Sequence, residues 1–370
     1  MTDERVIGLA HTEPTRASFV APMQATAGHV PSLDGLRAVS ILLVLAGHFI
    51  NRAFFPGGLG VLIFFVISGF LITRLMFAEW RATEHLSIGR FYWRRLWRLY
   101  PAVITYCLAV VGLYALTARP IDPLEPLSAL FYFTNFLYAS YSFHGVAGHM
   151  PFIIFWSLSI EEHFYWLFPL LFVVLRADAL RLARVMMALC AICLLARLAI
   201  VFVYPAILQT SVIYWTEFRI DSIGFGVLLA ALCELDGGRE FLEQLTKPAP
   251  VAVAVLGVLI SLLWRSPWFR ETFRYSIEAG SIAVLVSAVL FSERYRPLQI
   301  ALNLAPMVWI GLLSYSLYVW HSLAGIILRS TMHSEPTGIL IVVELALSLA
   351  MAAVSYYAIE APLRRRFGKR

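Results

Sequence analysis

Charged side chains are scarce in this sequence: only 14% of its 370 residues are Asp, Glu, Lys or Arg, whereas 60% are hydrophobic. Soluble globular domains carry about 25% charged residues, so the composition excludes that class and indicates a polytopic membrane protein. The net charge of +6 does not indicate a nucleic-acid-binding protein, because the basic residues are spread over short gaps between long apolar runs.

Cysteine is also rare, with four residues that all fall inside apolar runs: Cys107, Cys190, Cys193 and Cys233. Cys190 and Cys193 have the C-x-x-C spacing, but no second pair follows them. We therefore interpret the cysteines as buried side chains and expect no metal site. The first 31 residues are polar and mixed and lack the apolar core of a cleavable signal peptide, so we expect a disordered cytoplasmic tail there.

Long apolar runs, in contrast, are abundant, and ten of them are long enough to predict transmembrane helices. They cover residues 36–52, 57–77, 101–118, 153–175, 181–204, 216–235, 249–264, 275–292, 304–328 and 337–358. A further run, 126–143, is short and aromatic, which favours an interfacial or re-entrant segment but leaves an eleventh span open. The sequence thus predicts an all-α transmembrane domain over residues 32–362 and a basic tail over 363–370.

The distribution of basic residues predicts the orientation of these helices. With a cytoplasmic N-terminus, 20 of the 29 basic residues lie in cytoplasmic segments, six lie outside and three lie within spans. We therefore expect both termini on the cytoplasmic side. An eleventh span at 126–143 would move the basic C-terminal run outside, which disfavours it.

The first apolar run carries Arg37 and His48, and ionisable groups within a membrane helix are costly enough to indicate a function. Eleven helical steps turn the chain through about 1100°, roughly 20° more than three turns, so the two side chains share one face. They are about 16 Å apart along the axis. In the predicted orientation Arg37 lies near the cytoplasmic end and His48 near the outer end.

Three arginines, Arg94, Arg95 and Arg98, form the densest basic stretch near the predicted cytoplasmic surface. They have the chemistry to grip a polyanion such as a nucleotide diphosphate. Arginine beside tryptophan and tyrosine is also what membrane anchoring and the positive-inside rule produce, so spacing alone leaves both interpretations open.

A second group of polar residues gathers in the predicted outer half of the spans: His48, Trp156, Glu161, Glu162, Arg219, Asp221 and His321. A neutral histidine oriented by a carboxylate suits removal of a hydroxyl proton near neutral pH. Glu161, Glu162 or Asp34 could supply that carboxylate. Glu161 and Glu162 point about 100° apart on a helix, so we expect one to face the site and the other a different partner.

Two further features have structural alternatives. Arg219 and Asp221 could be a buried pair that neutralises itself rather than part of a site. Ser68 lies in the run Phe64–Leu71, which by itself indicates close helix packing with a hydroxyl bonded back to its own helix.

Together these motifs resemble the acyltransferase 3 family of integral membrane acyltransferases over about residues 31 to 367. The residues that carry the resemblance are Leu36-Arg37 with His48; Phe64-Phe65-x-x-Ser68-Gly69-Phe70-Leu71; Arg94-Arg95-x-x-Arg98-x-x-Pro101; Trp156-Ser157-Leu158-x-x-Glu161-x-x-Phe164-Tyr165-x-x-x-Pro169; Arg219-x-Asp221; Ser314-Tyr-Ser-Leu-Tyr-x-Trp-His321; and Glu360-x-Pro362.

The resemblance implies an O-acyltransferase of the bacterial inner membrane. Such an enzyme takes an acyl group, often acetyl, from cytoplasmic acyl-coenzyme A (acyl-CoA) to a hydroxyl of a carbohydrate or glycolipid on the outer side. It suggests His48 as the catalytic histidine, Arg37 as a donor contact, and Arg94, Arg95 and Arg98 for the phosphates. Two departures are Leu99-Tyr100, where isoleucine is commoner, and the lack of a fused hydrolase-like domain, which implies a stand-alone enzyme.

The alternative from another class is a proton-coupled transporter or flippase of a lipid-linked sugar or small anion, with Glu161 and His48 as its proton relay. No internal repeat or pair of broken helices is apparent in the sequence, which favours the enzyme. The aromatic connection at 126–149 is where we expect the acceptor to bind.

Overall fold

The computed structural model describes residues 32–50, 54–145, 150–205, 214–331 and 338–368, and these ranges contain helices and no strand. The all-α prediction is therefore confirmed for the described residues. The predicted tail at 1–31 and the last two residues of the predicted basic tail lie outside these ranges.

Each of the ten apolar runs forms a helix. They are α1 (Leu33–Phe49), α2 (Gly57–Thr83), α3 (Ile88–Leu116), α6 (Phe155–Val174), α7 (Ala179–Val203), α8 (Asp221–Leu232), α10 (Pro248–Leu263), α12 (Arg274–Phe291), α14 (Ala305–Thr331) and α15 (Gly338–Val354). Shorter helices connect them: α4 (Leu124–Leu130), α5 (Thr134–Phe143), η3 (Thr216–Phe218), α9 (Gly238–Leu245), α11 (Pro267–Glu271), η4 (Glu293–Tyr295) and α13 (Arg296–Leu302). A π-helical turn, η5 (Ser355–Glu360), continues α15 into α16 (Ala361–Phe367).

Fewer than ten of these helices have the length and hydropathy of a membrane span. Within the described residues six qualify, and the bent pair α9 and α10, with 65° between them, makes a seventh if counted as one span. The helices α1, α8 and α10 have only 17, 12 and 16 residues, against the ~20 that cross a bilayer. Ionisable residues such as Glu161 and Glu162 lower the hydropathy of α6. The polytopic membrane fold is confirmed, whereas the predicted count of ten is larger than these criteria support.

The run at 126–143 is not one continuous helix. It divides into α4 and α5, of seven and ten residues, which are joined at Tyr132 in a left-handed backbone conformation with φ of 54°. Neither helix reaches the length of a span, so this run does not supply an eleventh transmembrane helix.

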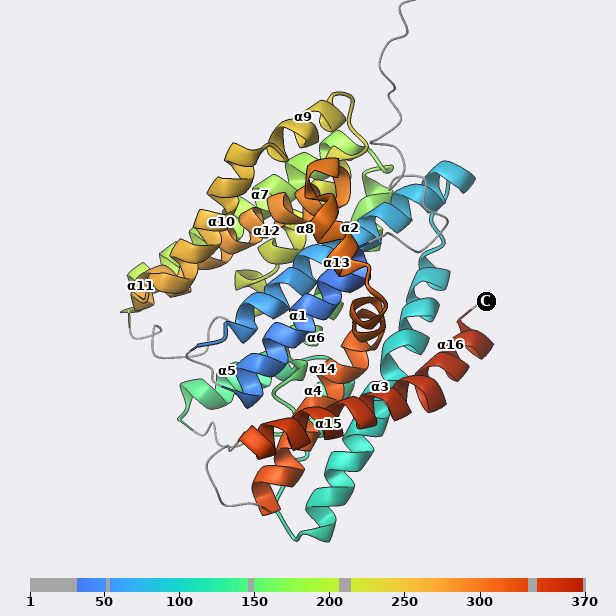
Figure 1. Ribbon diagram of the computed structural model, residues 1–370, viewed down its shortest axis with the longest axis vertical. Coiled ribbons are helices and arrows are strands. Elements are labelled where there is room, and N and C mark those ends of the chain that lie inside the picture. The colour runs from blue at the N-terminus through green and yellow to red at the C-terminus, as the bar shows by residue number, and fades with distance from the viewer. Residues whose placement is uncertain (1–31, 51–53, 146–149, 206–213, 332–337, 369–370) are drawn as a thin grey trace, which may run out of the picture.

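The first helix lies at the centre of the molecule. It packs against α2 on one side and α14 on the other, α2 packs in turn against α8, and α14 packs against α15. Figure 1 shows α9, α10 and α12 at one end of this arrangement and α3, α15 and α16 at the other. The helix with Arg37 and His48 is therefore packed between α2 and α14, while its residue Leu42 is 42% exposed.

Glycines allow the central helices to approach closely. A Cβ atom on Gly69 of α2 would lie 2.1 Å from the carbonyl oxygen of Ile223 in α8, and one on Gly311 of α14 would lie 1.9 Å from that of Asp34 in α1. The small-residue packing predicted for the Phe64–Leu71 run is thus confirmed at Gly69. These contacts bring backbones of neighbouring helices together, as small residues do in membrane proteins.

Candidate active site

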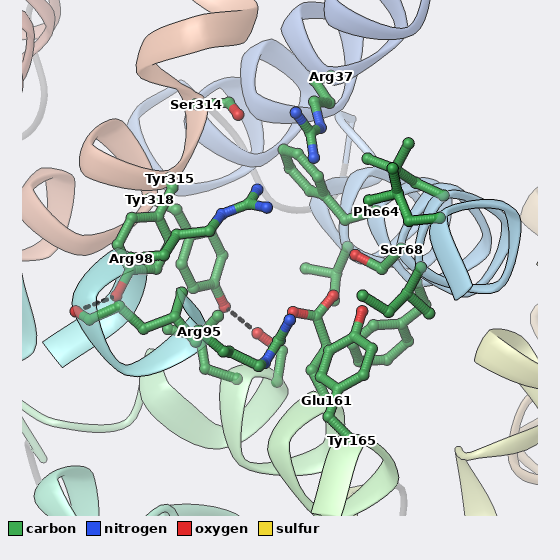
Figure 2. A pocket seen from close by; sticks show the side chains of 18 residues that line it. Arg37, Phe64, Ser68, Arg95, Arg98, Glu161, Tyr165, Ser314, Tyr315 and Tyr318 are labelled. Atoms are coloured by element: carbon green, nitrogen blue, oxygen red, sulfur yellow. Dashed lines mark hydrogen bonds between the residues drawn. The ribbon is translucent and has the colours of Figure 1, made fainter. Parts of the chain in front are cut away.

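A cavity of about 100 Å³ lies where α1, α2, α3, α6 and α14 meet. A water molecule needs roughly 10–15 Å³ on a comparable measure, so the cavity admits a small organic group. Its polar lining, part of which is shown in Figure 2, consists of Arg37, Ser68, Arg95, Arg98, Ser157, Glu161, Tyr165, Ser314, Tyr315 and Tyr318. The cavity thus brings together five of the residues singled out in the sequence: Arg37, Ser68, Arg95, Arg98 and Glu161.

Arg95 is held by α6. Its Nε donates a hydrogen bond of 2.5 Å to Glu162 Oε1, and its guanidinium lies 3.4 Å from the ring centroid of Tyr165. Both partners leave the Arg95 side chain little freedom, and Glu162 compensates its charge. Arg95 is therefore positioned as part of the cavity wall.

Arg98 and Arg37 are less compensated. They point into the same space from α3 and α1 (Figure 2). Arg37 has a long contact of 3.5 Å to Asp34, while Arg98 is exposed and makes no ion pair or side-chain hydrogen bond with any described residue. Arg37 and Arg95 lie close enough to Arg98 for their positive charges to repel its own. Of the three arginines that line the cavity, Arg98 thus makes no ion pair with a described residue, so its guanidinium is available to an anionic ligand.

Glu161 and Glu162 face different partners, as the 100° between neighbouring helical residues predicts. Glu162 binds Arg95, whereas Glu161 lines the cavity beside the hydroxyl of Ser68. Ser68 also lies next to the hydroxyl of Tyr165 (Figure 2). Its role is therefore in the cavity, and the hydroxyl that bonds back to α2 is that of Thr73, which donates to Gly69 O.

His48 does not line this cavity but lies behind it, against His321. The two ring centroids are 4.9 Å apart, and His321 in turn contacts Tyr318, which lines the cavity. His48 Nδ1 is 2.8 Å from the carbonyl oxygen of Val44. Since a carbonyl can only accept, Nδ1 carries the proton and Nε2 of the neutral ring keeps its lone pair.

His321 has the same tautomer for the same reason. Its Nδ1 lies 2.7 Å from Tyr318 O and 3.2 Å from Leu317 O, and its Nε2 is buried without a hydrogen-bond partner among the described residues. The side chain is only 1% exposed. Two rings with basic Nε2 atoms therefore lie side by side.

Trp156 and Arg219 come together next to the cavity. The Arg219 guanidinium lies 3.9 Å from the ring centroid of Tyr275, 5.6 Å from that of Trp156 and 6.0 Å from that of Phe65, which lines the cavity. Arg219 is 3% exposed, and its Nε has no hydrogen-bond partner among the described residues. Cation–π contacts thus hold the guanidinium, and Glu271 is near enough to interact with its charge without an ion pair within 4 Å.

Asp221 does not pair with Arg219, so the self-neutralising pair considered from the sequence is wrong. Asp221 Oδ2 accepts a hydrogen bond of 2.7 Å from Arg197 Nη2 and another of 2.9 Å from Ser276. Arg197 also donates to the carbonyl oxygens of Thr272 and Phe218. Sequence reasoning missed Arg197, although an arginine in the middle of the predicted span 181–204, away from Arg181 and Arg184 at its end, was a signal that it needed a buried acid.

Of the three arginines predicted to bind phosphates, Arg94 is the one that does not line the cavity. It extends from α3 away from the cavity and binds Glu79 at 3.1 Å, with 45% of its side chain exposed.

Sequence reasoning also missed the tyrosines Tyr165, Tyr315 and Tyr318. Their hydroxyls meet groups on other helices, such as Ser157 for Tyr318 and Leu99 O for Tyr315. Among the described residues no group of three or more His, Cys, Asp and Glu could hold a metal ion.

The fold and this cavity define a polytopic helical membrane protein with an arginine-lined site beside a pair of histidines. Residues 30–360 match the acyltransferase 3 family, described as an acyltransferase domain, and the chain belongs to this family. No solved structure matches the chain.

Relatives with curated names include the O-acetyltransferase OatA of Staphylococcus aureus strain NCTC 8325 / PS 47, which is 29% identical over 357 residues. A putative O-acetyltransferase of S. aureus strain COL is 28% identical over 352 residues. Both matches cover 91% of this chain, which spans 58% of the length of each relative.

Proposed function

We propose that this protein is an O-acyltransferase of the bacterial inner membrane that moves an acyl group, acetyl by preference, from acyl-CoA to a hydroxyl of a carbohydrate or glycolipid. The observation that carries the proposal is the cavity lined by Arg37, Arg95 and Arg98, with the two histidines, His48 and His321, packed beside its wall at Tyr318. Membership of an acyltransferase family and the O-acetyltransferase names of the relatives support the reaction type.

The donor binds through its phosphates at the positively charged mouth of the cavity. Arg98 provides a guanidinium without a protein partner among the described residues, and Arg37 provides a second that is only loosely held by Asp34. The planar fork of arginine suits phosphate oxygens. Arg95 is fixed by Glu162, so it shapes the site, and Arg94, paired outside with Glu79, contributes to the surrounding charge.

The acyl arm then runs along α1 toward His48. The helix is continuous from Leu33 to Phe49, so the ~16 Å rise between Arg37 and His48 holds. His48 Nε2 removes the proton from the acceptor hydroxyl, and the oxygen attacks the thioester carbonyl carbon. The C–S bond breaks, the leaving thiolate takes the proton from His48, and the products are the acyl ester and free coenzyme A. An acyl-histidine intermediate is the less favoured variant.

The orientation of His48 comes from the backbone carbonyl of Val44 in this arrangement. Glu161 remains a proposed catalytic residue through its carboxyl in the cavity, beside Ser68. Arg219 is a candidate to stabilise the oxyanion that forms on the thioester oxygen, because its guanidinium makes no ion pair within 4 Å in the part of the chain that the structure describes.

The proposed topology places donor and acceptor on opposite sides, with both termini and the arginine-lined mouth in the cytoplasm and the acceptor outside. The rival is a proton-coupled transporter or flippase. The bent pair α9 and α10 is the one feature of that kind among the described residues, and it carries none of the site residues. Family membership favours the transferase.

Substitution of His48 tests the proposal. Purified wild-type protein should release thiol from acetyl-CoA in the presence of an acceptor glycan, and His48→Ala should abolish release while donor binding persists. His85→Ala is the control, because His85 is exposed on the turn between α2 and α3 and does not line the cavity. Retained transfer in His48→Ala, or proton-coupled uptake without thiol release, would overturn the assignment.

A further inference from the structure

The C-terminal helix α16 is fastened to the arginine-bearing segment of α3. The ring of Phe367 stacks on Trp97 with centroids 4.4 Å apart and an interplanar angle of 20°. Trp93 Nε1 donates a hydrogen bond of 2.8 Å to Phe367 O. These contacts fix one face of α16 against the turn of α3 that carries Arg98.

Arg364 lies on that same face of α16. It precedes Phe367 by three residues, which places the two side chains about 60° apart around the helix, whereas Arg365 and Arg366 lie about 160° and 100° from Phe367. The Arg364 side chain is close enough to Arg98 for the two positive charges to repel each other. Of the three consecutive arginines, Arg364 thus has the backbone position closest to the face that packs on α3, while the Arg366 guanidinium lies 5.3 Å from the Phe367 ring centroid.

Arg364 has no ion pair within 4 Å among the described residues. Its Nη2 donates a hydrogen bond of 3.2 Å to Tyr356 OH, and its guanidinium lies 5.6 Å from the Tyr356 ring centroid. The neighbouring acid is Glu360, whose Oε1 already accepts from Ser316 and Ser355 at 2.7 Å each. The Tyr356 ring therefore steadies Arg364 and leaves donors of its guanidinium available.

Two guanidinium groups at this rim share one carboxylate. Arg98 and Arg364 both lie near the buried Glu360, and neither makes an ion pair with a described residue, whereas Arg37 contacts Asp34. The guanidinium groups of Arg98 and Arg364 repel each other unless an anion lies between them. A ligand with several phosphate charges supplies that compensation.

We infer that Arg364 completes the donor site: together with Arg98 it binds the phosphates of the nucleotide part of acyl-CoA at the cavity mouth. The inference rests on the proposed function and adds a residue from the C-terminal segment to it. Arg364 is exposed and does not line the cavity, so it meets the phosphates rather than the acyl arm.

Truncated donors test this assignment in the full-length protein. Arg364→Gln should raise the KM for acetyl-CoA at least about tenfold, since about 1.4 kcal/mol is a factor of ten and a hydrogen bond to a charged group is worth that or more, while kcat stays near wild type. With S-acetyl-pantetheine, which has no phosphates, the same variant should match the wild type. Arg365→Gln is the control on the same helix, because Arg365 is exposed and lies about 160° from Phe367, and it should change the KM for neither donor.

Other outcomes overturn the inference in distinguishable ways. An equal loss with S-acetyl-pantetheine means that Arg364 is structural, and an equal effect of Arg365→Gln means that only the total charge matters. A lipid phosphate is the competing source of the same chemistry. It would be indicated if Arg364→Gln leaves both KM values unchanged but weakens the dependence of thermal stability on anionic lipid in nanodiscs. If wild type transfers no acyl group from either donor, the proposed function itself fails.

Discussion

The ion pair between Arg197 and Asp221 is closed off from solvent, with side chains 2% and 0% exposed. Breaking a buried pair leaves a charge without compensation, which typically costs about 3–5 kcal/mol. We therefore expect Asp221→Asn to lower the free energy of unfolding by about that amount, measured by denaturation in detergent micelles.

The exposed pair Arg239 and Glu243 on α9 provides the comparison. Its side chains are 38% and 51% exposed, and an exposed pair of this kind contributes about 0.3–0.5 kcal/mol. Glu243→Gln should thus leave unfolding almost unchanged. If Asp221→Asn were no more destabilising than Glu243→Gln, the buried network would not have the structural role assigned to it.

At the same scale, the sequence singled out five of the residues that line the cavity, but it did not predict all the partners of the residues that it singled out. Helical spacing correctly placed Glu161 and Glu162 on different faces and drew attention to Arg37 and His48. It could not show that Asp221 pairs with Arg197, 24 residues away, rather than with a neighbour. A periodicity identifies the face of a helix, whereas the partner depends on which helix packs against that face.

Helix crossings can be tested at their glycines. A Cβ on Gly311 would lie 1.9 Å from Asp34 O, so Gly311→Ala should push α14 away from α1 and cost about 1–3 kcal/mol of stability. Gly112 lies inside α3, and a Cβ added there would meet no atom of another segment within 4 Å. Gly112→Ala should therefore be neutral or stabilising, because alanine favours helix by about 1 kcal/mol. Equal melting temperatures for both variants would contradict the close crossing.

The connecting helix α4 should make stability depend on pH. Burial, with a smaller contribution from Asp122, raises the pKa of Glu125 to about 7, whereas an unfolded glutamate titrates near 4.5. Between these two pH values, Glu125 keeps its proton in the folded protein and loses it in the unfolded chain. The stability that this protonated carboxyl contributes is complete below pH 4.5 and is lost as the pH rises through about 7.

Glu125→Gln, which stays uncharged, should therefore be relatively more stable than wild type at about pH 8 than at about pH 5. Melting temperatures at the two pH values measure this difference. Glu240→Gln, at an exposed position on α9, is the control. A Glu125→Gln variant whose melting temperature changes with pH as much as that of wild type would argue against a buried neutral carboxyl at this position.

For the elements, hydrophobic run length predicted all ten principal helices but not how many of them are long enough to cross a bilayer. The predicted spans are longer than the observed helices because apolar residues continue beyond the helix ends. The predicted span 216–235, for example, contains the turn η3 followed by α8, which has only 12 residues. In the same way the run 249–264 became α10, bent by 65° from α9. Hydropathy detects burial in lipid or protein alike, whereas helix ends depend on local turns and packing.

For the whole molecule, the topology is the expectation on which the direction of acyl transfer depends. The sequence places Arg176 and Arg296 on the cytoplasmic side and Arg119 and Arg265 outside, and all four side chains are exposed. Single cysteines at these positions should react with a membrane-impermeant maleimide in two classes. Arg119→Cys and Arg265→Cys should label in intact cells, and Arg176→Cys and Arg296→Cys only after the membrane is opened.

The native cysteines give a low background for this experiment, because Cys107, Cys190 and Cys193 are buried and Cys233 is half-buried. Wild-type protein under the same conditions is the control. Labelling of Arg176→Cys from outside and of Arg265→Cys only from inside would contradict the predicted topology. Both positions would then lie on the side of the membrane opposite to the predicted one. The arginines at the cavity mouth could then not meet a cytoplasmic donor, and an acceptor outside would have no path to His48.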